Sequence, residues 1–227
     1  MIDLSIVYPA YNEEDNLPTL LNSTMQVLQD SNINFELIIV NDGSTDKTQN
    51  ILNRFKETYP KIIRIIEHDH NLGYGQSLKD GFLAANGQYV FYTDSDLQFD
   101  LNEIKKFYAL KHEKTLVIGY RIDRQDAPLR IFMAKGYRFL INLLFNLGVK
   151  DIDCAFKLFP KTLFQDISID SKKFLIDAEI LIKAKKQGYA IHELGVKHYA
   201  RQHGQSTVKW FHILLTLKEM FRLKLTL

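Results

Sequence analysis

The stretch Gln88-Tyr89-Val90-Phe91-Tyr92-Thr93-Asp94-Ser95-Asp96-Leu97-Gln98 determines how this sequence is interpreted. It begins as an apolar run rich in Tyr, Val and Phe, which is typical of a buried strand. It ends in two carboxylates, Asp94 and Asp96, where that strand is expected to leave the core. Carboxylate oxygens are the ligands that hard divalent cations prefer. The pattern therefore predicts a binding site at the end of a strand.

Strand-like and helix-like segments alternate on both sides of this stretch, through the first 121 residues. We expect strands at 4–9, 35–41, 62–67, 89–93 and 116–120, and helices at 15–29, 45–59, 75–86 and 101–110. This alternation predicts an α/β fold with a mainly parallel sheet and helices on both faces.

Beyond residue 121 the pattern changes. We expect a long amphipathic helix over 130–147 that Gly136 interrupts, a strand over 154–159 and a helix over 175–186. One or two strands follow within 189–199, and a last helix covers 208–225. Because no linker, repeat or low-complexity tract separates the halves, we expect a single domain over residues 1–227.

Composition and charge narrow the class of protein. The single cysteine, Cys154, suits a reducing cytoplasm, and neither a signal peptide nor a membrane-spanning run is expected. Residues 1–120 hold 10 Lys and Arg against 17 Asp and Glu, whereas residues 121–227 hold 19 against 10. The basic second half indicates an anionic partner: nucleic acid, a membrane surface or a phosphorylated substrate.

Polar clusters follow four of the expected strands. In a parallel sheet these clusters share one edge, where ligands of such folds bind. They are 9–13, 41–46, 68–73 and 94–96.

Several common sites do not match. An EF-hand loop would need Gly at Phe99 and Glu at Lys105, and the phosphatase type of Asp-x-Asp follows the first strand rather than the fourth. No Gly-x-x-x-x-Gly-Lys phosphate loop occurs, and Leu78 replaces the third glycine of a dinucleotide fingerprint.

Five motifs in their order along the chain resemble family 2 glycosyltransferases, most closely the dolichol-phosphate mannose synthase-like branch. They are Pro9-Ala10-Tyr11-Asn12-Glu13-Glu14, Asn41-Asp42-Gly43-Ser44-Thr45-Asp46, Asn71-Leu72-Gly73, Asp94-Ser95-Asp96-Leu97-Gln98 and Gly119-Tyr120-Arg121. The resemblance covers essentially the whole chain. It implies a GT-A type fold, with a nucleotide-sugar half over 1–121 and an acceptor half over 122–227.

The resemblance also implies roles on the donor side. Asp42 would accept a hydrogen bond from the nucleotide base, and Asp94 would hold the ribose or the donor side. Asp96, with Gln98, would coordinate Mg²⁺ or Mn²⁺ against the diphosphate, whose charge the metal neutralises as it departs. The remaining nucleotide-sugar contacts implied are Pro9, Ala10, Tyr11, Glu13, Gly73 and Ser95.

On the acceptor side, the chemistry depends on the nucleophile. A sugar hydroxyl requires a general base, whereas a phosphate monoester is already anionic and requires cations instead. The second half is rich in cations, among them Arg124, Lys135 and Arg138, although a solvated helix face is an equally good interpretation of the last two. By resemblance, the acceptor-binding residues are Arg121, Arg130, Lys157 and Ser206.

Catalytic roles are expected for Asp94, Asp96, Arg121, Arg201 and Asp151. Arg201 begins an Arg-x-x-Gly-x-Ser motif that would close over the donor phosphates, and Asp151 is the first candidate for a base or an acceptor contact. Asp153 is the second candidate. Asp177 and Glu179 lie two apart on a helix and are expected to point to different faces.

The last expected helix carries an apolar stripe from Trp210 to Leu225, flanked by Lys218, Arg222 and Lys224. Such a helix either packs on the protein core or lies in a membrane interface. We expect a cytoplasmic protein bound peripherally at the inner face of the membrane, with no nucleic-acid partner.

These observations lead to one main hypothesis, a metal-dependent inverting transfer of a sugar from a UDP- or GDP-sugar to an acceptor, plausibly a polyprenyl phosphate. The first alternative is transfer to a saccharide hydroxyl in polysaccharide or glycolipid synthesis. The second is a non-catalytic nucleotide-sugar sensor. A nucleotidyltransferase would need a Gly-rich basic loop after the first strand, where 9–13 stands instead.

Overall fold

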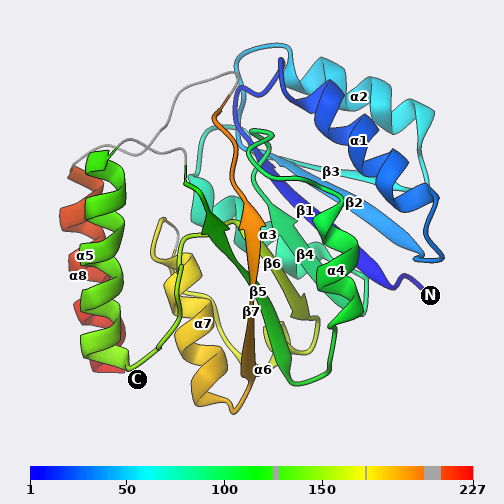
Figure 1. Cartoon of the computed structure of the whole chain (residues 1–227). Helices are drawn as coiled ribbons and strands as arrows, with labels where there is room; N and C mark the ends of the chain where they lie inside the picture. Colours follow the sequence, from blue (N-terminus) through cyan, green and yellow to red (C-terminus); the bar gives the residue numbers. More distant parts are fainter. Residues whose placement is uncertain (125–127, 172, 202–210, 227) are drawn as a thin grey trace.

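A computed structural model describes residues 1–124, 128–171, 173–201 and 211–226, without the side chains of 128–130, 211–215 and 217. Its centre is a seven-stranded sheet of order β3-β2-β1-β4-β6-β5-β7 (Figure 1). The strands are β1 (Leu4–Ala10), β2 (Phe35–Asn41), β3 (Ile63–Glu67), β4 (Tyr89–Thr93), β5 (Thr115–Ile122), β6 (Phe156–Pro160) and β7 (Ala190–Lys197).

Helices cover both faces of this sheet (Figure 1). They are α1 (Leu17–Gln29), α2 (Thr48–Thr58), α3 (Tyr74–Ala84), α4 (Glu103–Ala109), α5 (Pro128–Phe145), α6 (Leu163–Asp166), α7 (Ile176–Lys186) and α8 (Phe211–Thr226). All seven residues of β2 are buried, because strands covered on both faces have no solvated side. The predicted α/β fold with a mainly parallel sheet is confirmed.

Three parallel pairings bring four strand ends to one edge. β1 pairs in parallel with both β2 and β4, and β2 pairs in parallel with β3. The loops that follow these strands are the four polar clusters of the sequence, so they meet at the carboxyl edge of the sheet as expected.

The second half of the chain continues the same sheet. β6 runs antiparallel between β4 and β5, and β7 pairs in parallel with β5 over its full length. The segment 189–199 therefore supplies one strand rather than two. Helix α5 runs unbroken through Gly136, contrary to the expected interruption, because a single glycine weakens a helix without ending it.

Helices α5 and α8 lie side by side, beside the sheet rather than on the α1–α2 side (Figure 1). Lys224 Nζ in α8 donates to the Leu144 carbonyl in α5 at 2.7 Å. Among the described residues, no helix combines the length and the apolar character needed to cross a bilayer.

Candidate active site

The loops after β1 and β2 are joined by side-chain hydrogen bonds at the carboxyl edge. The Asn12 backbone N–H donates to Ser44 Oγ at 2.9 Å, and the Thr45 N–H donates to Asn12 Oδ1 at 2.8 Å. Ser95 Oγ, after β4, donates to the Pro9 carbonyl at 2.8 Å. Glu13 is tied to the region after β2 in the same way, because its backbone N–H donates to Thr48 Oγ1 at 2.9 Å. The predicted donor-side residues Pro9, Ala10, Tyr11, Glu13 and Ser95 therefore lie in or beside loops that these hydrogen bonds hold together.

Asp42 directly follows β2, and its carboxylate makes most of its hydrogen bonds within the protein. Its two oxygens accept the backbone N–H groups of Leu72 and Gly73 at 2.8 and 2.9 Å, and Oδ1 lies 2.7 Å from His68 Nδ1. A carboxylate offers about four acceptor positions, so little remains for a nucleotide base. The observed role of Asp42 is to hold the loop after β3, and the base contact stays a prediction.

Asp96 meets Arg201 from the far end of the chain. Arg201 Nη2 lies 2.5 Å from Asp96 Oδ2, and the Gln98 backbone N–H donates to Asp96 Oδ1 at 3.2 Å. The Asp96 carboxylate is only 3% exposed, whereas the Arg201 side chain is 27% exposed and still reaches water. The structure thus brings together two predicted catalytic residues that are 105 positions apart.

Asp94 lies beside this pair with one oxygen unused. Its Oδ1 is buried without a hydrogen-bond partner among the described residues. Burial first, and then the neighbouring Asp96 charge, raise the pKa of Asp94 to about 7, although a hydrogen bond with Tyr74 opposes the shift. A buried acceptor with a raised pKa lacks a cation or donor that a bound ligand could supply.

The donor set at this edge fits Mg²⁺ or Mn²⁺. Magnesium sites commonly use one or two carboxylates together with substrate phosphates and water, rather than a cage made only of protein. The described residues contain no cluster of three or more His, Cys, Asp or Glu side chains able to enclose a metal. Asp96 and the unpartnered Asp94 Oδ1 match the two-carboxylate arrangement, whereas the Gln98 side chain donates Nε2 to the Tyr199 carbonyl at 2.9 Å.

On the predicted acceptor side, Arg121 in β5 makes two side-chain hydrogen bonds to Asp151. Arg121 Nε donates to Oδ2 at 2.7 Å and Nη2 donates to Oδ1 at 2.8 Å. Burial would raise the pKa of Asp151, but the Arg121 hydrogen bonds and charge outweigh it and hold that pKa below its usual value. Asp151 is therefore a poor general base, because a low pKa means weak affinity for a proton.

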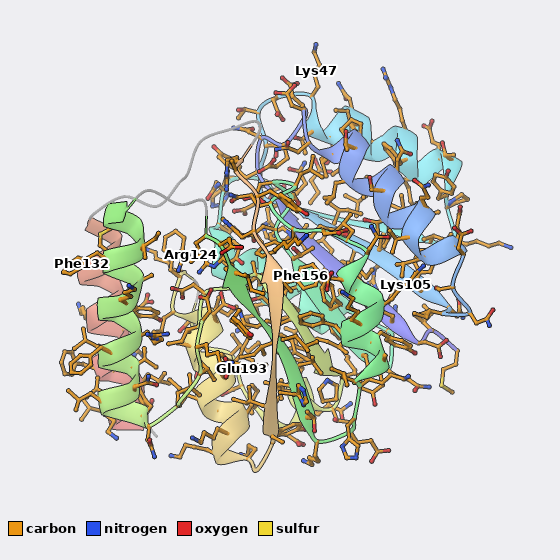
Figure 2. The ribbon with its side chains drawn as sticks, viewed as in Figure 1. Lys47, Lys105, Arg124, Phe132, Phe156 and Glu193 are labelled. Carbon is orange, nitrogen blue, oxygen red and sulfur yellow. The ribbon has the colours of Figure 1, made fainter. Side chains whose placement is uncertain are left out.

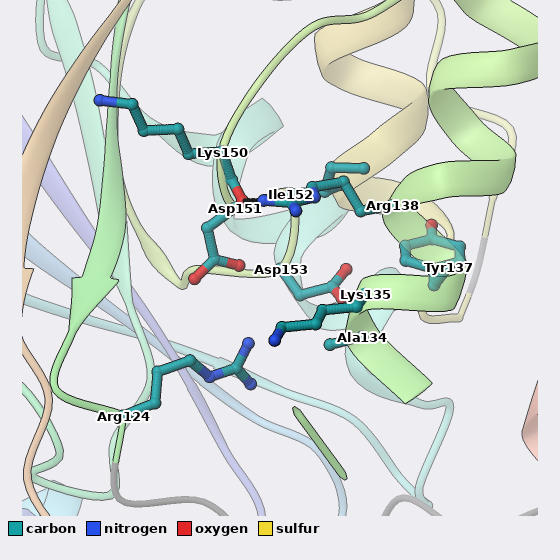
Figure 3. A pocket seen from close by; sticks show the side chains of 9 residues that line it. All are labelled: Arg124, Ala134, Lys135, Tyr137, Arg138, Lys150, Asp151, Ile152 and Asp153. Carbon is teal, nitrogen blue, oxygen red and sulfur yellow. Dashed lines mark hydrogen bonds between the residues drawn. The ribbon is translucent and has the colours of Figure 1, made fainter. Parts of the chain in front are cut away.

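A small hollow of about 40 Å³ opens beside this pair (Figure 3). Figure 3 shows the ends of Arg124 and Lys135 pointing toward one another below the carboxylates of Asp151 and Asp153. Burial first, and then the charges of Asp177 and Asp151, raise the pKa of Asp153 to about 7. The residues around the hollow are Arg124, Ala134, Lys135, Tyr137, Arg138, Lys150, Asp151, Ile152 and Asp153.

Three predicted acceptor residues are not seen at this surface. Lys157 was expected to contact the acceptor, but the structure buries it completely. The Arg130 side chain and Ser206 lie outside the described residues. Asp177 and Glu179 are both buried. The sequence analysis assigned no role to His68, Tyr74 or Lys150. Of the three, His68 had the clearest signal, because it directly follows a predicted strand.

The sheet order and the carboxylates at its parallel edge define the class of protein, a GT-A type fold of the nucleotide-sugar transferases. The sequence model described as Glycosyl transferase family 2 matches residues 5–168. The chain belongs to glycosyl transferase family 2, and the predicted resemblance to its dolichol-phosphate branch is confirmed.

Two curated relatives illustrate this branch. The dolichyl-phosphate beta-glucosyltransferase ALG5A of Trichomonas vaginalis is 34% identical over 213 residues, covering 86% of this chain and 65% of the relative. The dolichyl-phosphate beta-glucosyltransferase of Dictyostelium discoideum is 30% identical over 215 residues, covering 86% and 66%. The chain thus spans about two thirds, or slightly less, of the length of these relatives.

Solved structures share the fold at low sequence identity. Glucosyl-3-phosphoglycerate synthase from Mycobacterium tuberculosis, in complex with UDP, superposes with a TM-score of 0.75 at 17% identity, covering 99% of this chain and 79% of that one. Staphylococcus aureus TarS gives a TM-score of 0.62 at 22% identity, covering 88% and 60%. At these identities the similarity supports the fold alone.

Proposed function

We propose that this chain is an inverting glycosyltransferase that moves a sugar from a nucleoside-diphosphate sugar to a polyprenyl phosphate. One observation carries the choice of acceptor: Arg121 neutralises Asp151 and lowers its pKa, beside a hollow bordered by Arg124 and Lys135. An anionic phosphate oxygen needs cations and no base, which is what these residues offer. The names of the relatives, dolichyl-phosphate beta-glucosyltransferases, support the same acceptor.

The donor would bind across the loops that follow β1, β2 and β4. Asp94 would orient the ribose or the sugar, and Asp96 would hold a divalent cation that neutralises charge on the leaving diphosphate. Arg201 would add a second positive charge, because its guanidinium already lies against Asp96. Glucosyl-3-phosphoglycerate synthase has been crystallised with Mn²⁺ and UDP-glucose, so this metal and this donor are the first to test.

The acceptor phosphate would approach from the hollow, on the side of Arg121, Arg124 and Lys135. These cations would hold the phosphate so that one oxygen faces the anomeric carbon opposite the leaving group. The transfer inverts the anomeric centre in a single displacement, and positioning is the main contribution of the protein.

The substitution Asp96→Ala tests this assignment. We expect turnover of UDP-glucose with farnesyl phosphate and Mn²⁺ to fall at least about 100-fold, near 3 kcal/mol in transition-state stabilisation. Circular dichroism should show the fold retained. Asp69→Ala is the matched control, because Asp69 is an exposed carboxylate in a loop at the same edge. Unchanged turnover in Asp96→Ala would refute the metal role.

Transfer to a saccharide hydroxyl is the second candidate, and Asp153 favours it. A carboxyl with a pKa of about 7 is suited to act as a general base near neutral pH. If the acceptor is a hydroxyl, Asp153→Asn should abolish transfer. If it is a phosphate, transfer should persist. A nucleotide-sugar sensor would show neither transfer nor donor hydrolysis with any sugar nucleotide.

We also infer contact with an anionic membrane surface, through α5 more than through α8 alone. Phe132, Phe139 and Leu143 of α5 are 75%, 66% and 69% exposed, and Phe132 projects away from the body of the protein (Figure 2). Phe221 and Leu225 of α8 are exposed as well. Lys218, Arg222 and Lys224 of α8 are also exposed, and exposed aromatic side chains together with cations suit an interface rich in anionic lipid.

A further inference from the structure

Lys157 is a fully buried lysine whose ammonium has all its donors in use. Nζ donates to the Tyr92 hydroxyl at 2.8 Å, to the Cys154 carbonyl at 2.6 Å and to Asp177 Oδ1 at 2.6 Å. An ammonium has three N–H groups, so none remains for a substrate. The Tyr92 hydroxyl also donates to Asp177 Oδ1, which closes a compact network of Lys157, Tyr92 and Asp177.

This network joins three parts of the chain that border the candidate site: β4, the segment 151–154 and α7. Tyr92 and Lys157 are direct partners in the antiparallel pairing of β4 with β6, and Asp94 follows Tyr92 by two residues. Cys154 ends the segment 151–154, which carries Asp151 and Asp153. Asp177 stands in the first turn of α7. The Lys157 ammonium therefore links β4, the segment 151–154 and α7.

Stability alone is a weak reason for such a network. Removing two charges from water is so costly that apolar residues of similar size often replace a buried ion pair without loss of stability. An apolar residue at position 157 would, however, leave the Cys154 carbonyl without this donor. The ion pair, unlike an apolar pair, fixes the orientation of the backbone segment 151–154, which carries Asp153.

We propose that Lys157, held by Asp177 and Tyr92, is a positioning residue that fixes the segment 151–154 against β4, the strand that leads into Asp94 and Asp96. This inference rests on the proposed function, because it concerns how the acceptor side is aligned with the donor side. Lys157 acts through the Cys154 carbonyl and through its charge, without touching either substrate.

The charge of Lys157 affects the pKa of Asp153, and this effect can be measured. The groups that face Asp153 are Asp177 of α7, Asp151 of its own segment, Arg121 of β5, Lys157 of β6 and Tyr137 of α5. Arg124, Lys135, Arg138 and Lys150 also border the hollow. Asp177 and Asp151 raise the pKa of Asp153, whereas Arg121 and Lys157 lower it. Removing Lys157 should therefore raise this pKa further, because the Asp177 charge is then uncompensated.

The experiment measures kcat and the KM for farnesyl phosphate between pH 5.5 and 9, with saturating UDP-glucose and Mn²⁺. In the wild type we expect the acceptor KM to change near pH 7, where Asp153 ionises beside the phosphate. In Lys157→Met that inflection should move about one pH unit higher. Its kcat should fall at least about tenfold, because small misplacements of reacting groups are costly.

The double variant Lys157→Met with Asp177→Asn removes both charges. It can be measured if the single variant does not fold, because it leaves no uncompensated buried charge. We expect its inflection to return to that of the wild type or below it, because the Asp177 charge acts on Asp153 more strongly than the Lys157 charge does. Its kcat should stay low, because the Cys154 carbonyl still lacks the Lys157 donor. Lys161→Met is the matched control: Lys161 directly follows β6, in which Lys157 lies, and likewise donates to a backbone carbonyl, that of Phe82, at 2.8 Å. It should lower Tm without moving the inflection.

Two outcomes would contradict two different claims: the positioning role of Lys157 and the proposed function. If the wild type transfers sugar and both Lys157 variants keep its kcat and its pH inflection, with only Tm lowered, Lys157 is merely structural and the inference is wrong. If the wild type transfers no sugar to any phosphate or hydroxyl acceptor, the proposed function itself fails.

Discussion

At the residue scale, Asp153 shows how one carboxyl can be unfavourable for folding and useful in a site. Burial and two neighbouring carboxylates raise its pKa to about 7, whereas in the unfolded chain the same group ionises near 4. Near neutral pH the folded protein therefore holds a proton that the unfolded chain releases. Such tension between stability and local charge is common at functional sites.

The pH dependence of stability follows with a definite sign. Because the folded-state pKa of Asp153 is raised, the unfolded state binds fewer protons above pH 4, and Asp153 lowers stability progressively until about pH 7. Asp153→Asn should therefore stabilise the protein more at pH 8 than at pH 5, by on the order of 2 kcal/mol in urea unfolding. Asp15→Asn, at an exposed carboxylate, should show no such difference. An equal effect at both pH values would contradict the raised pKa.

Lys157 shows what a sequence does and does not reveal about a residue. A lysine within a basic half of the chain was interpreted as a cation for the acceptor, and its chemistry alone allowed that. Its partners, Tyr92 and Asp177, are 65 and 20 positions away. No local pattern indicates such pairing, whereas Asp94 and Asp96 could be predicted because strand ends in a parallel sheet share an edge.

At the scale of elements, apolar runs and helical periodicity predicted most strands and helices to within a few residues. The predicted strand 35–41 coincides with β2, and the predicted 89–93 coincides with β4. What could not be predicted was the antiparallel insertion of β6 between β4 and β5, because periodicity identifies a strand without naming its neighbours. The short helix α6 was missed for want of any periodic signal.

Gly43 provides a test of how one turn supports the nucleotide side. It has a φ of +65°, and a Cβ there would lie 2.4 Å from the His70 carbonyl carbon, in the loop that Asp42 holds. Gly43→Ala should therefore cost about 2–4 kcal/mol of unfolding free energy, through backbone strain and overpacking. Donor KM should rise as the loop after β3 is displaced.

Gly148→Ala is the control for this substitution. Gly148 also has a positive φ, +77°, but a Cβ there would meet nothing within 4 Å. It should lose only about 1 kcal/mol, the strain of the left-handed conformation alone. Equal losses in the two variants, measured by urea unfolding, would show that the approach of His70 does not matter.

At the scale of the whole molecule, charge and exposed apolar surface are distributed in a way that suits a lipid substrate. The acidic half supplies the carboxylates at the parallel edge of the sheet, and the basic half supplies Arg121, Arg201 and the cations around the hollow. The exposed face of α5 and α8 belongs to the same half. A polyprenyl phosphate has an apolar chain and an anionic head, so a protein that acts on it benefits from both kinds of surface.

Membrane binding through α5 gives the last prediction. Phe132→Ser with Phe139→Ser should weaken binding to anionic liposomes at low salt roughly tenfold or more, since each exposed aromatic side chain loses part of its burial in the interface. Raising the salt concentration should weaken binding of the wild type, because the exposed Lys218, Arg222 and Lys224 would be screened from the lipid headgroups. Leu83→Ser is the matched control: Leu83 is 55% exposed on α3, away from this face, and its loss should leave sedimentation with liposomes unchanged. Wild-type protein that stays in the supernatant at low salt, or equal losses in both variants, would exclude α5 as the membrane-facing helix.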